Sequence, residues 1–363
     1  MKLFSPLTLG TLELPNRVVM APLTRVRSGD AGIPGDIVVD YYRQRASLGL
    51  IVSEGTYPSH AGQGFPGQPG LVEDEQLVGW KRVTDAVHAD GGRIVAQVMH
   101  AGRVTHPDTT GGHEVVAPSA IAIDGTTRVP MGNQPYPVPH ALTADELPGV
   151  IGEFVTASRK AIHVAGFDGV ELHGANGYLL HEFLSPESNQ REDVYGGTPE
   201  KRAQFVIELV TAVAAEVGAE KVGLRISPAH NIQDALETEA ADVHATYGSL
   251  VDAIAPLKLA YLSILHAEPT GDLAQDLRKR FGGPFLINSG FGVITNRDDA
   301  IAILEDGVGD AVVVGRPAIA NPDLARRWSD NLPENEANPA TFYSPGAEGY
   351  TDYPFHDGSV NSN

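Results

Sequence analysis

The sequence of 363 residues has no cysteine, and its 26 lysine and arginine residues are outnumbered by 46 aspartate and glutamate residues. The absence of cysteine excludes disulfides, thiolate metal sites, iron–sulfur clusters and cysteine nucleophiles. The net charge of −20 disfavours binding to nucleic acid or to anionic membranes. No apolar run is long enough for a transmembrane helix, and residues 1–7 lack the apolar stretch of a secretory signal. We therefore expect a cytoplasmic protein, monomeric or homodimeric, whose partners are small molecules.

What the sequence does contain is an alternation of short apolar runs and amphipathic segments. Continuous runs of Val, Ile and Leu suit parallel strands that are buried on both faces. Eight strand–helix repeats without a long linker predict an α/β fold, a single (β/α)8 TIM barrel spanning residues 1–363, with a doubly wound sheet as the alternative. The predicted strands are 17–22, 49–53, 93–99, 169–172, 222–227, 260–265, 284–288 and 311–315, and the predicted helices lie near 37–48, 75–90, 143–165, 199–217, 239–256, 271–281, 295–306 and 322–330.

Three segments lie outside these repeats. Residues 1–16 contain two short strands around a Gly-Thr turn, which predicts an N-terminal β-hairpin rather than a barrel strand. Residues 104–140 are rich in proline and glycine and show no clear period, so we expect a long loop after the third strand, on the catalytic face. Residues 333–363 are loop-like, and their aromatic side chains indicate that this tail packs back onto the barrel.

The fourth predicted strand is followed by three polar side chains, His173, Asn176 and Tyr178. Polar groups at the carboxyl end of a strand in an α/β protein usually face a ligand. His173 and Asn176 can donate two hydrogen bonds to one oxygen, and Tyr178 offers a phenol two residues further on. A capped turn with a buried tyrosine is the alternative interpretation.

Glycines and a cation follow the seventh and eighth predicted strands, with Ser289 and Gly290 after one and Gly315 and Arg316 after the other. Glycines let backbone N–H groups approach a phosphate, and arginine adds a bidentate charge. The loops after these strands are the usual phosphate site of a TIM barrel. We therefore predict a phosphate-binding site here, with Thr295 capping the helix that follows strand seven. Glycines that serve only as turns are the alternative.

Between these two groups we place Thr24, Gln97 and Arg225. Gln97 can donate to and accept from a flat imide edge, and Thr24 can donate to a carbonyl. Arg225 can hold negative charge that develops on a ring. Together with a phosphate site at one end, these side chains suit a flavin. Taken singly, Gln97 and Arg225 could also be a buried core pair, and Thr24 could be a cap.

Motifs that run from one end of the chain to the other support this interpretation. They occupy residues 3–6, 16–25, 53–56, 97–103, 171–197, 225–228, 289–291, 314–317 and 349–354. With these motifs the chain resembles the Old Yellow Enzyme family of FMN-dependent ene reductases. The 171–197 block and the Met-Ala-Pro-Leu-Thr-Arg run are specific in combination.

The resemblance implies a role for each candidate residue. His173 and Asn176 would bind the activating oxygen of the substrate, Tyr178 would donate a proton to its α-carbon, and Met99 and Tyr343 would add to the substrate pocket. Two further groups would hold tightly bound FMN: Pro22, Leu23, Thr24, Gly55, Gln97 and Arg225 around the isoalloxazine, and Ser289, Gly290, Gly315 and Arg316 around the phosphate.

The implied activity is a ping-pong reduction of C=C bonds activated by carbonyl, imide or nitro groups. NADPH or NADH would reduce FMN, and hydride would pass from flavin N5 to the β-carbon of the alkene. No metal site is expected. Members of the family often have tryptophan where this chain has Met99, and the loop 266–271 has no aromatic residue. These departures leave the substrate range and the face selectivity open.

Two other functions are weighed against this one. A cofactor-free lyase or aldolase acting on a sugar phosphate would need a lysine or a metal cluster at the strand ends. The lysines at 201, 221, 258 and 279 fall in predicted helices, helix ends or loops instead. A flavin- or ligand-binding protein without turnover is the second alternative.

Overall fold

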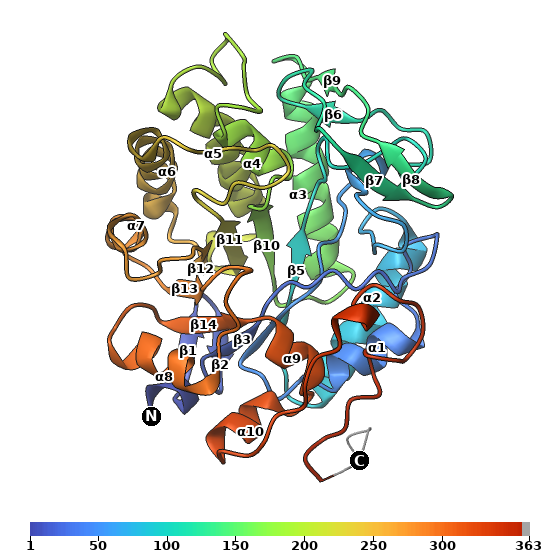
Figure 1. Cartoon of the computed structure of the whole chain (residues 1–363), viewed down its shortest axis with the longest axis vertical. Helices are drawn as coiled ribbons and strands as arrows, with labels where there is room; N and C mark the ends of the chain where they lie inside the picture. The colour runs from blue at the N-terminus through green and yellow to red at the C-terminus, as the bar shows by residue number, and fades with distance from the viewer. Residues whose placement is uncertain (358–363) are drawn as a thin grey trace.

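The computed structural model describes residues 1–357, and a closed barrel of eight parallel strands lies at its centre (Figure 1). The strands are β3 (Val18–Met20), β4 (Leu50–Val52), β5 (Ile94–Val98), β10 (Gly169–Gly174), β11 (Val222–Ile226), β12 (Tyr261–Leu265), β13 (Phe285–Asn288) and β14 (Ala311–Val314). Each overlaps one predicted strand. Neighbours follow the order β10, β11, β12, β13, β14, β3, β4, β5, and β5 closes onto β10. This closure confirms the TIM barrel and rules out the doubly wound sheet.

Most side chains on both faces of the barrel strands are apolar because both faces are covered. Side chains alternate between the two faces of a strand. In β3, Val19 packs with the residues inside the barrel, whereas Val18 and Met20 pack in the larger cluster that includes the helices. The two packing environments explain why the strands read as continuous apolar runs in the sequence.

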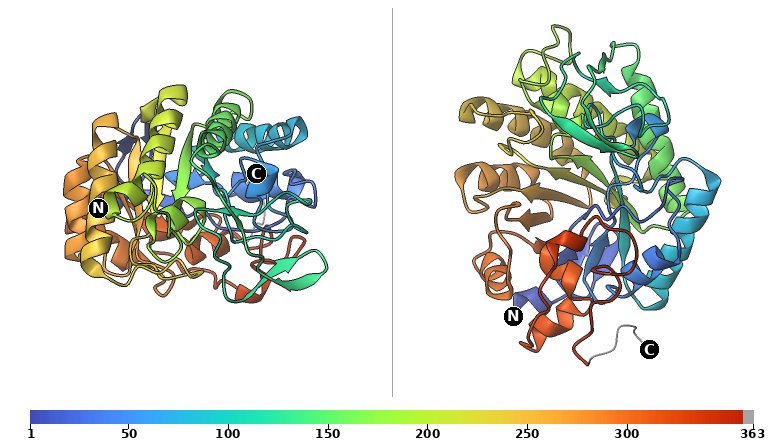
Figure 2. Two further views of the ribbon diagram at one scale, coloured as in Figure 1. Left: turned by 90° about the horizontal axis from the view of Figure 1, so that it is seen from above. Right: turned by 45° about the vertical axis from the view of Figure 1, so that its right-hand side comes forward.

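Helices form a ring around the strands (Figure 2). Those that overlap the predicted segments are α1 (Asp36–Arg43), α2 (Asp74–Ala89), α3 (Leu147–His163), α5 (Pro199–Val217), α6 (Ala240–Ile254), α7 (Asp272–Phe281), α8 (Arg297–Glu305) and α10 (Leu324–Ser329). Two further helices, α4 (Leu179–Leu184) and α9 (Arg316–Ala320), were not predicted, because six and five residues are too few to show a helical period. Within residues 1–357, none of the helices has the length and apolar character needed to span a bilayer.

The N-terminal hairpin closes the amino-terminal end of the barrel. Strands β1 (Leu7–Leu9) and β2 (Leu12–Leu14) pair antiparallel, as predicted. Leu9, Leu12 and Leu14 are buried against interior residues from the first half of several barrel strands. The hairpin therefore acts as an apolar plug.

The segment 104–140 is less irregular than predicted. It contains the short pair β6 (Val116–Ala117) and β9 (His140–Ala141), and the hairpin of β7 (Thr126–Val129) and β8 (Gly132–Pro135). The long loop predicted after the third strand is present, and the β7–β8 hairpin within it was not predicted. Only alternate residues of β7 are buried and every residue of β8 is exposed, so the pair leaves a weak hydrophobic pattern in the sequence.

The C-terminal tail packs back onto the barrel, as its aromatic residues indicated. Tyr350 is buried and stacks on Tyr41 of α1, with ring centroids 4.0 Å apart. Arg25, which follows β3, donates hydrogen bonds of 3.1 and 2.7 Å to two backbone carbonyls of the tail. The predicted tail, 333–363, ends in residues 358–363, which lie outside the described part of the chain.

Candidate active site

A cavity of about 410 Å³ lies at the carboxyl ends of the barrel strands. Every candidate residue named from the sequence lines it, except Gly55 and Ser289. The cavity thus brings together segments that are far apart in the chain. Its wall consists of Ala21, Pro22, Leu23, Thr24, Gln97, Met99, His173, Asn176, Tyr178, Arg225, Ile232, Gln233, Asn288, Gly290, Phe291, Val293, Ile294, Thr295, Val313, Gly315, Arg316, Pro317, Ile319, Phe342 and Tyr343.

The two exceptions lie next to the cavity rather than on its wall. A β-carbon at Gly55 would come within 2.6 Å of the sulfur of Met99 and 3.4 Å of the side-chain oxygen of Gln97. Gly55 therefore lets two wall residues pack closely behind the cavity. Ser289 lines an adjoining hollow of about 170 Å³, which shares Gly290 with the cavity.

A left-handed turn presents His173, Asn176 and Tyr178 to the cavity. Asn176 has a φ of +60° and Gly177 a φ of +79°, and asparagine and glycine are the residues that adopt this conformation most readily. The backbone N–H of Asn176 donates to Ser227 Oγ at 2.9 Å. The rings of His173 and Tyr178 lie with their centroids 5.3 Å apart. The Asn176 Oδ1 atom is buried and has no hydrogen-bond partner among the described residues.

Burial sets the protonation state of the histidine. Desolvation, reinforced by the positive charge of Arg225, holds the pKa of His173 well below its usual value, so the imidazole is neutral at pH 7. Its Nδ1 atom lies 3.3 Å from Nε2 of Gln97, and an amide nitrogen can only donate. Nδ1 is therefore the acceptor, and the proton resides on Nε2. His173 can donate that single N–H to a ligand.

Burial also keeps Tyr178 protonated. Desolvation raises the pKa of its phenol above the usual value of 10, and a hydrogen bond from Gln233 opposes this shift. The phenol is consequently a neutral donor across the physiological pH range.

Below the cavity, Gln97 and Arg225 are organised by a carboxylate that we did not predict. Gln97 Nε2 donates to Glu171 Oε1 at 2.8 Å, and Tyr261 donates to Glu171 Oε2 at 3.1 Å. Both N–H groups of Gln97 thus face Glu171 and His173, which leaves the Gln97 oxygen free to accept. The only sequence signal for Glu171 is a charged residue inside an apolar strand.

The guanidinium group of Arg225 is deeply buried, but not all of its N–H groups have a hydrogen-bond partner within residues 1–357. Its Nη1 lies 3.4 Å from Ser263 Oγ, and its buried Nε has no partner among the described residues. Burial raises the pKa of the Glu171 carboxyl, whereas the Arg225 charge favours its ionised form. Gln97 therefore belongs to a hydrogen-bonded core network with Glu171, the charge of Arg225 acts on the same carboxyl, and both Gln97 and Arg225 line the cavity.

The opposite end of the cavity has backbone groups and one cation. Gly290, with a φ of +90°, donates its N–H to Asn288 Oδ1 at 3.1 Å. A β-carbon at Gly315 would meet only Leu23, at 3.6 Å, so the backbone there is open to a ligand. Arg316 begins α9 and donates to the carbonyl of Phe291 at 3.2 Å.

The predicted cap of the following helix was wrong by one residue. The side chain of Asn296 accepts from the N–H groups of Asp298 and Asp299 at 2.9 and 3.0 Å, and so caps α8. Asparagine is a stronger N-cap than threonine. Thr295 lines the cavity instead.

Apolar residues of the cavity rim were also missed. Phe291, Val293 and Ile294 are 49%, 50% and 52% exposed, which is unusual for large apolar side chains gathered in one loop. Such a surface indicates contact with an apolar part of a ligand. The sequence gives no period in this loop that would separate these residues from a buried strand end.

The chain is similar to known proteins over nearly its whole length. The family model described as the NADH:flavin oxidoreductase / NADH oxidase family matches residues 2–335. A "Probable flavin mononucleotide-dependent alkene reductase" from Leishmania infantum is 40% identical over 362 residues, covering 97% of each chain.

Two solved structures are similar over nearly the whole chain. The old yellow enzyme homologue from Zymomonas mobilis has a TM-score of 0.91 at 38% identity, covering 97% of this chain and 99% of that one. Morphinone reductase in complex with tetrahydroNAD has a TM-score of 0.90 at 41% identity, covering 97% of each. The chain therefore belongs to the NADH:flavin oxidoreductase / NADH oxidase family and is a homologue of the Old Yellow Enzymes.

Proposed function

We propose that the chain is an FMN-dependent ene reductase that reduces electron-poor C=C bonds with NADPH or NADH. The observation that carries this proposal is the meeting of two groups in one cavity. One group is His173, Asn176 and Tyr178, and the other is the glycine–arginine end formed by Gly315 and Arg316. The names of the alkene reductase relative and of the morphinone reductase complex support the same activity and reductant here.

The residues of the cavity fit FMN. A volume of about 410 Å³ is within the range of small-molecule sites. Pro22 and Leu23 offer apolar contact to a ring system, and the open backbone at Gly315 with Arg316 suits a phosphate. The unpartnered Nε of Arg225 is available to a ring nitrogen that becomes negative on reduction. When bound, FMN would supply hydride transfer from NAD(P)H to the β-carbon of the alkene.

His173 and Asn176 would hold the activating oxygen of the substrate. The neutral His173 donates through Nε2, and the Asn176 amide provides the second donor. Two donors aimed at one oxygen stabilise the negative charge that develops there, as in an oxyanion hole.

Tyr178 would complete the reaction with a proton. It lies on the same turn as Asn176, and its phenol is neutral at physiological pH. A proton delivered to the α-carbon neutralises the charge held by His173 and Asn176.

Monomeric or homodimeric state, cytoplasmic location and the single-domain boundary remain predictions.

The proposal is tested by colour and its recovery. Purified protein should be yellow, should bleach anaerobically with NADPH or NADH, and should regain colour when an enone is added. Bleaching without recovery by any enone, maleimide or nitroalkene would support a binding protein instead. Colourless protein that cleaves a sugar phosphate would support the lyase, although the described residues that line the cavity include no lysine. The same assay compares the two nicotinamides.

A further inference from the structure

The segment that follows β11 contains an unusual run of left-handed residues. Ala229, Gln233 and Asp234 have φ values of 57°, 55° and 55°. Residues with a side chain rarely adopt this conformation, and each instance costs free energy that surrounding contacts must offset. A segment with three of them in six residues is held in place by its neighbours.

Contacts from three directions hold this segment. The Arg103 guanidinium donates to the backbone carbonyl of Gln233 at 3.2 Å. The N–H of Asp124, in the excursion after β5, donates to Asp234 Oδ2 at 2.8 Å. Ala229 donates its N–H to the buried Glu237 at 2.7 Å. These contacts fix the backbone of Gln233 at the cavity wall.

The side chain of Gln233 reaches the residues that carry the proposed chemistry. Its Nε2 donates to the backbone carbonyl of Asn176 at 2.7 Å. Gln233 and Tyr178 both line the cavity, and the Gln233 amide acts as a hydrogen-bonding group that lowers the pKa of the Tyr178 phenol. Gln233 also packs closely against the backbone of Gly177, because a β-carbon at Gly177 would come within 2.9 Å of the Gln233 Cβ.

The chemistry of the amide decides the direction of the second bond. Its nitrogen carries two N–H groups, so one can donate to Asn176 and the other to the oxygen of Tyr178. A phenol oxygen that accepts in this bond keeps its own O–H free for another partner. The cavity, which both side chains line, is where that O–H can point.

We propose that Gln233 is a positioning residue for proton transfer, which aims the O–H of Tyr178 into the cavity and stabilises the phenolate that remains. This inference rests on the proposed role of Tyr178. In the step, the O–H bond breaks and its electron pair stays on the phenol oxygen. The electron pair of the substrate enolate forms the new C–H bond at the α-carbon, and water later returns a proton to Tyr178.

The first test is Gln233→Leu in the FMN-loaded enzyme. Loss of a donor to a developing charge should slow reoxidation by an enone roughly 10-fold. Reduction by NADPH and reoxidation by a quinone, which needs no proton at carbon, should be unchanged. Equal slowing of all three rates, or no slowing with the enone, would overturn the proposal.

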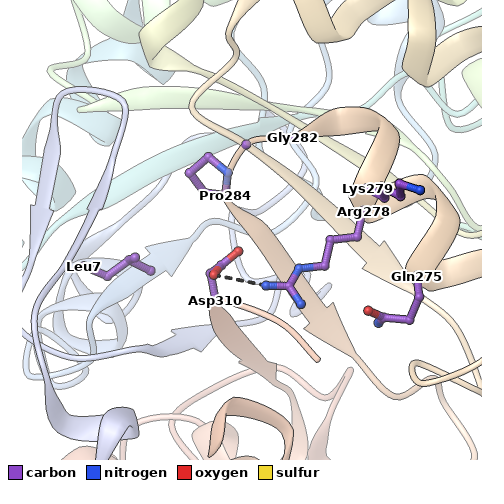
Figure 3. A pocket seen from close by; sticks show the side chains of 8 residues that line it. Leu7, Gln275, Arg278, Lys279, Gly282, Pro284 and Asp310 are labelled. Atoms are coloured by element: carbon purple, nitrogen blue, oxygen red, sulfur yellow. Dashed lines mark hydrogen bonds and ion pairs between the residues drawn. The ribbon is translucent and has the colours of Figure 1, made fainter. Parts of the chain in front are cut away.

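A matched control is available at the other end of the barrel. Gln275 of α7, labelled in Figure 3, also donates from Nε2 to backbone carbonyls. These are the carbonyls of Pro269 and Val308, at 2.7 and 3.1 Å. Gln275→Leu removes similar bonds from a residue that does not line the cavity and should leave all three rates unchanged. Slowing of the enone rate by Gln275→Leu as well would mean that any such loss acts through general stability.

Gln233→Glu adds a readout that a purely structural role would not move. A carboxylate at this position accepts the phenol proton and turns it away from the cavity. The enone rate should therefore be low at pH 8 and recover as the pH falls and the carboxyl becomes protonated. A pH profile that is parallel to that of the unmodified enzyme would contradict the proposal.

The double variant separates this inference from the role of Tyr178. If Gln233 acts through the phenol, Gln233→Leu should cause no further loss in a Tyr178→Phe background. Additive losses would overturn the positioning role and leave Tyr178 as the acid. A Tyr178→Phe variant with an undiminished enone rate would overturn the acid assignment and, with it, the role of Gln233.

Discussion

The two ends of the barrel differ in how their polar groups are satisfied. At the amino-terminal end, the leucines of the β1–β2 hairpin fill the interior. A surface hollow of about 550 Å³ lies beside the hairpin, and three of the polar side chains that line it, Gln275, Arg278 and Asp310, have protein partners (Figure 3). Gln275 donates to two carbonyls there, and Asp310 accepts from the Arg278 side chain and the Phe285 N–H. The size of a hollow therefore does not identify a site.

At the carboxyl end, buried polar atoms lack partners and the backbone is strained. Asn176 Oδ1, Arg225 Nε and Glu182 Oε2 have no hydrogen bond among the described residues, and Asn176 and Gln233 are left-handed. Such groups reduce stability and persist where a ligand or a reaction uses them. In the described part of the chain, the carboxyl end therefore holds unsatisfied buried groups beside the cavity, whereas apolar side chains of the hairpin fill the amino-terminal end, as the fold allows.

The largest expected effect is a pH dependence of the free energy of unfolding that arises at the carboxyl end of the barrel. Burial raises the pKa of Glu182, on α4 after the turn at Asn176 and Gly177, from 4.5 to about 8. The folded state therefore binds the Glu182 proton more tightly than the unfolded state does. The contribution of this proton to the free energy of unfolding is full below pH 4.5 and is lost as the pH rises through 8. The loss is on the order of 5 kcal/mol. Urea unfolding of Glu182→Gln should show equal stability at pH 4.5 and greater stability than the unmodified protein at pH 9.

If the unmodified protein and Glu182→Gln kept the same difference in free energy of unfolding at every pH, Glu182 would not be a buried acid. Asp310, which faces the hollow at the other end, offers the matched comparison. Its carboxylate has donors on both oxygens, so Asp310→Asn should lower stability and should not raise it at high pH.

The second prediction tests the stabilising end. Leu14 of the hairpin is 1% exposed, and Leu14→Ala should lower the free energy of unfolding by about 3 kcal/mol through the cavity it creates. Turnover of the folded enzyme should not change, because Leu14 lies at the end of the barrel away from the cavity. A fall in kcat together with unaltered stability would break the division between the two ends.

The third prediction concerns the donors to the substrate oxygen. His173→Ala and Asn176→Ala should each lower turnover about 100-fold, by analogy with the loss of one oxyanion-hole donor. The affinity for a phenol inhibitor, measured by its charge-transfer band, should fall in both variants. Unchanged affinity in both would place the oxygen elsewhere in the cavity.

The smallest effect is expected at Thr24, which lines the cavity after β3. Loss of one hydrogen bond to the flavin in Thr24→Ala should destabilise its reduced form by about 1 kcal/mol, or about 20 mV in the two-electron potential. The potential should become more negative, which a dye-linked titration can measure. A potential within error of the unmodified protein would remove Thr24 from the contacts.

The strands and the site residues were predictable for different physical reasons. Strands that are buried on both faces are largely apolar, so continuous apolar runs in the sequence indicate where they lie. Polar residues directly after such strands, such as His173 and Arg316, are recognisable because parallel strands share one carboxyl end. The short helices α4 and α9 lack the length to show a period.

The residues that were missed depend on contacts between distant segments. Glu171 matters because it meets Gln97 from β5 and Tyr261 from β12. Gln233 matters because a left-handed segment brings it to Asn176. Neither contact has a period or a spacing in the sequence, so only the folded structure indicates their place.

We propose that the carboxyl end of the barrel performs alkene reduction with Tyr178 as the proton donor. Stopped-flow measurement of the two half-reactions in Tyr178→Phe tests it most directly, because the ring is kept and only the hydroxyl group is lost. Reduction by NADPH should proceed at nearly the unmodified rate, and reoxidation by an enone should slow by roughly 10²–10⁴-fold. An equal loss in both halves, or an enone rate that does not change, would contradict the account.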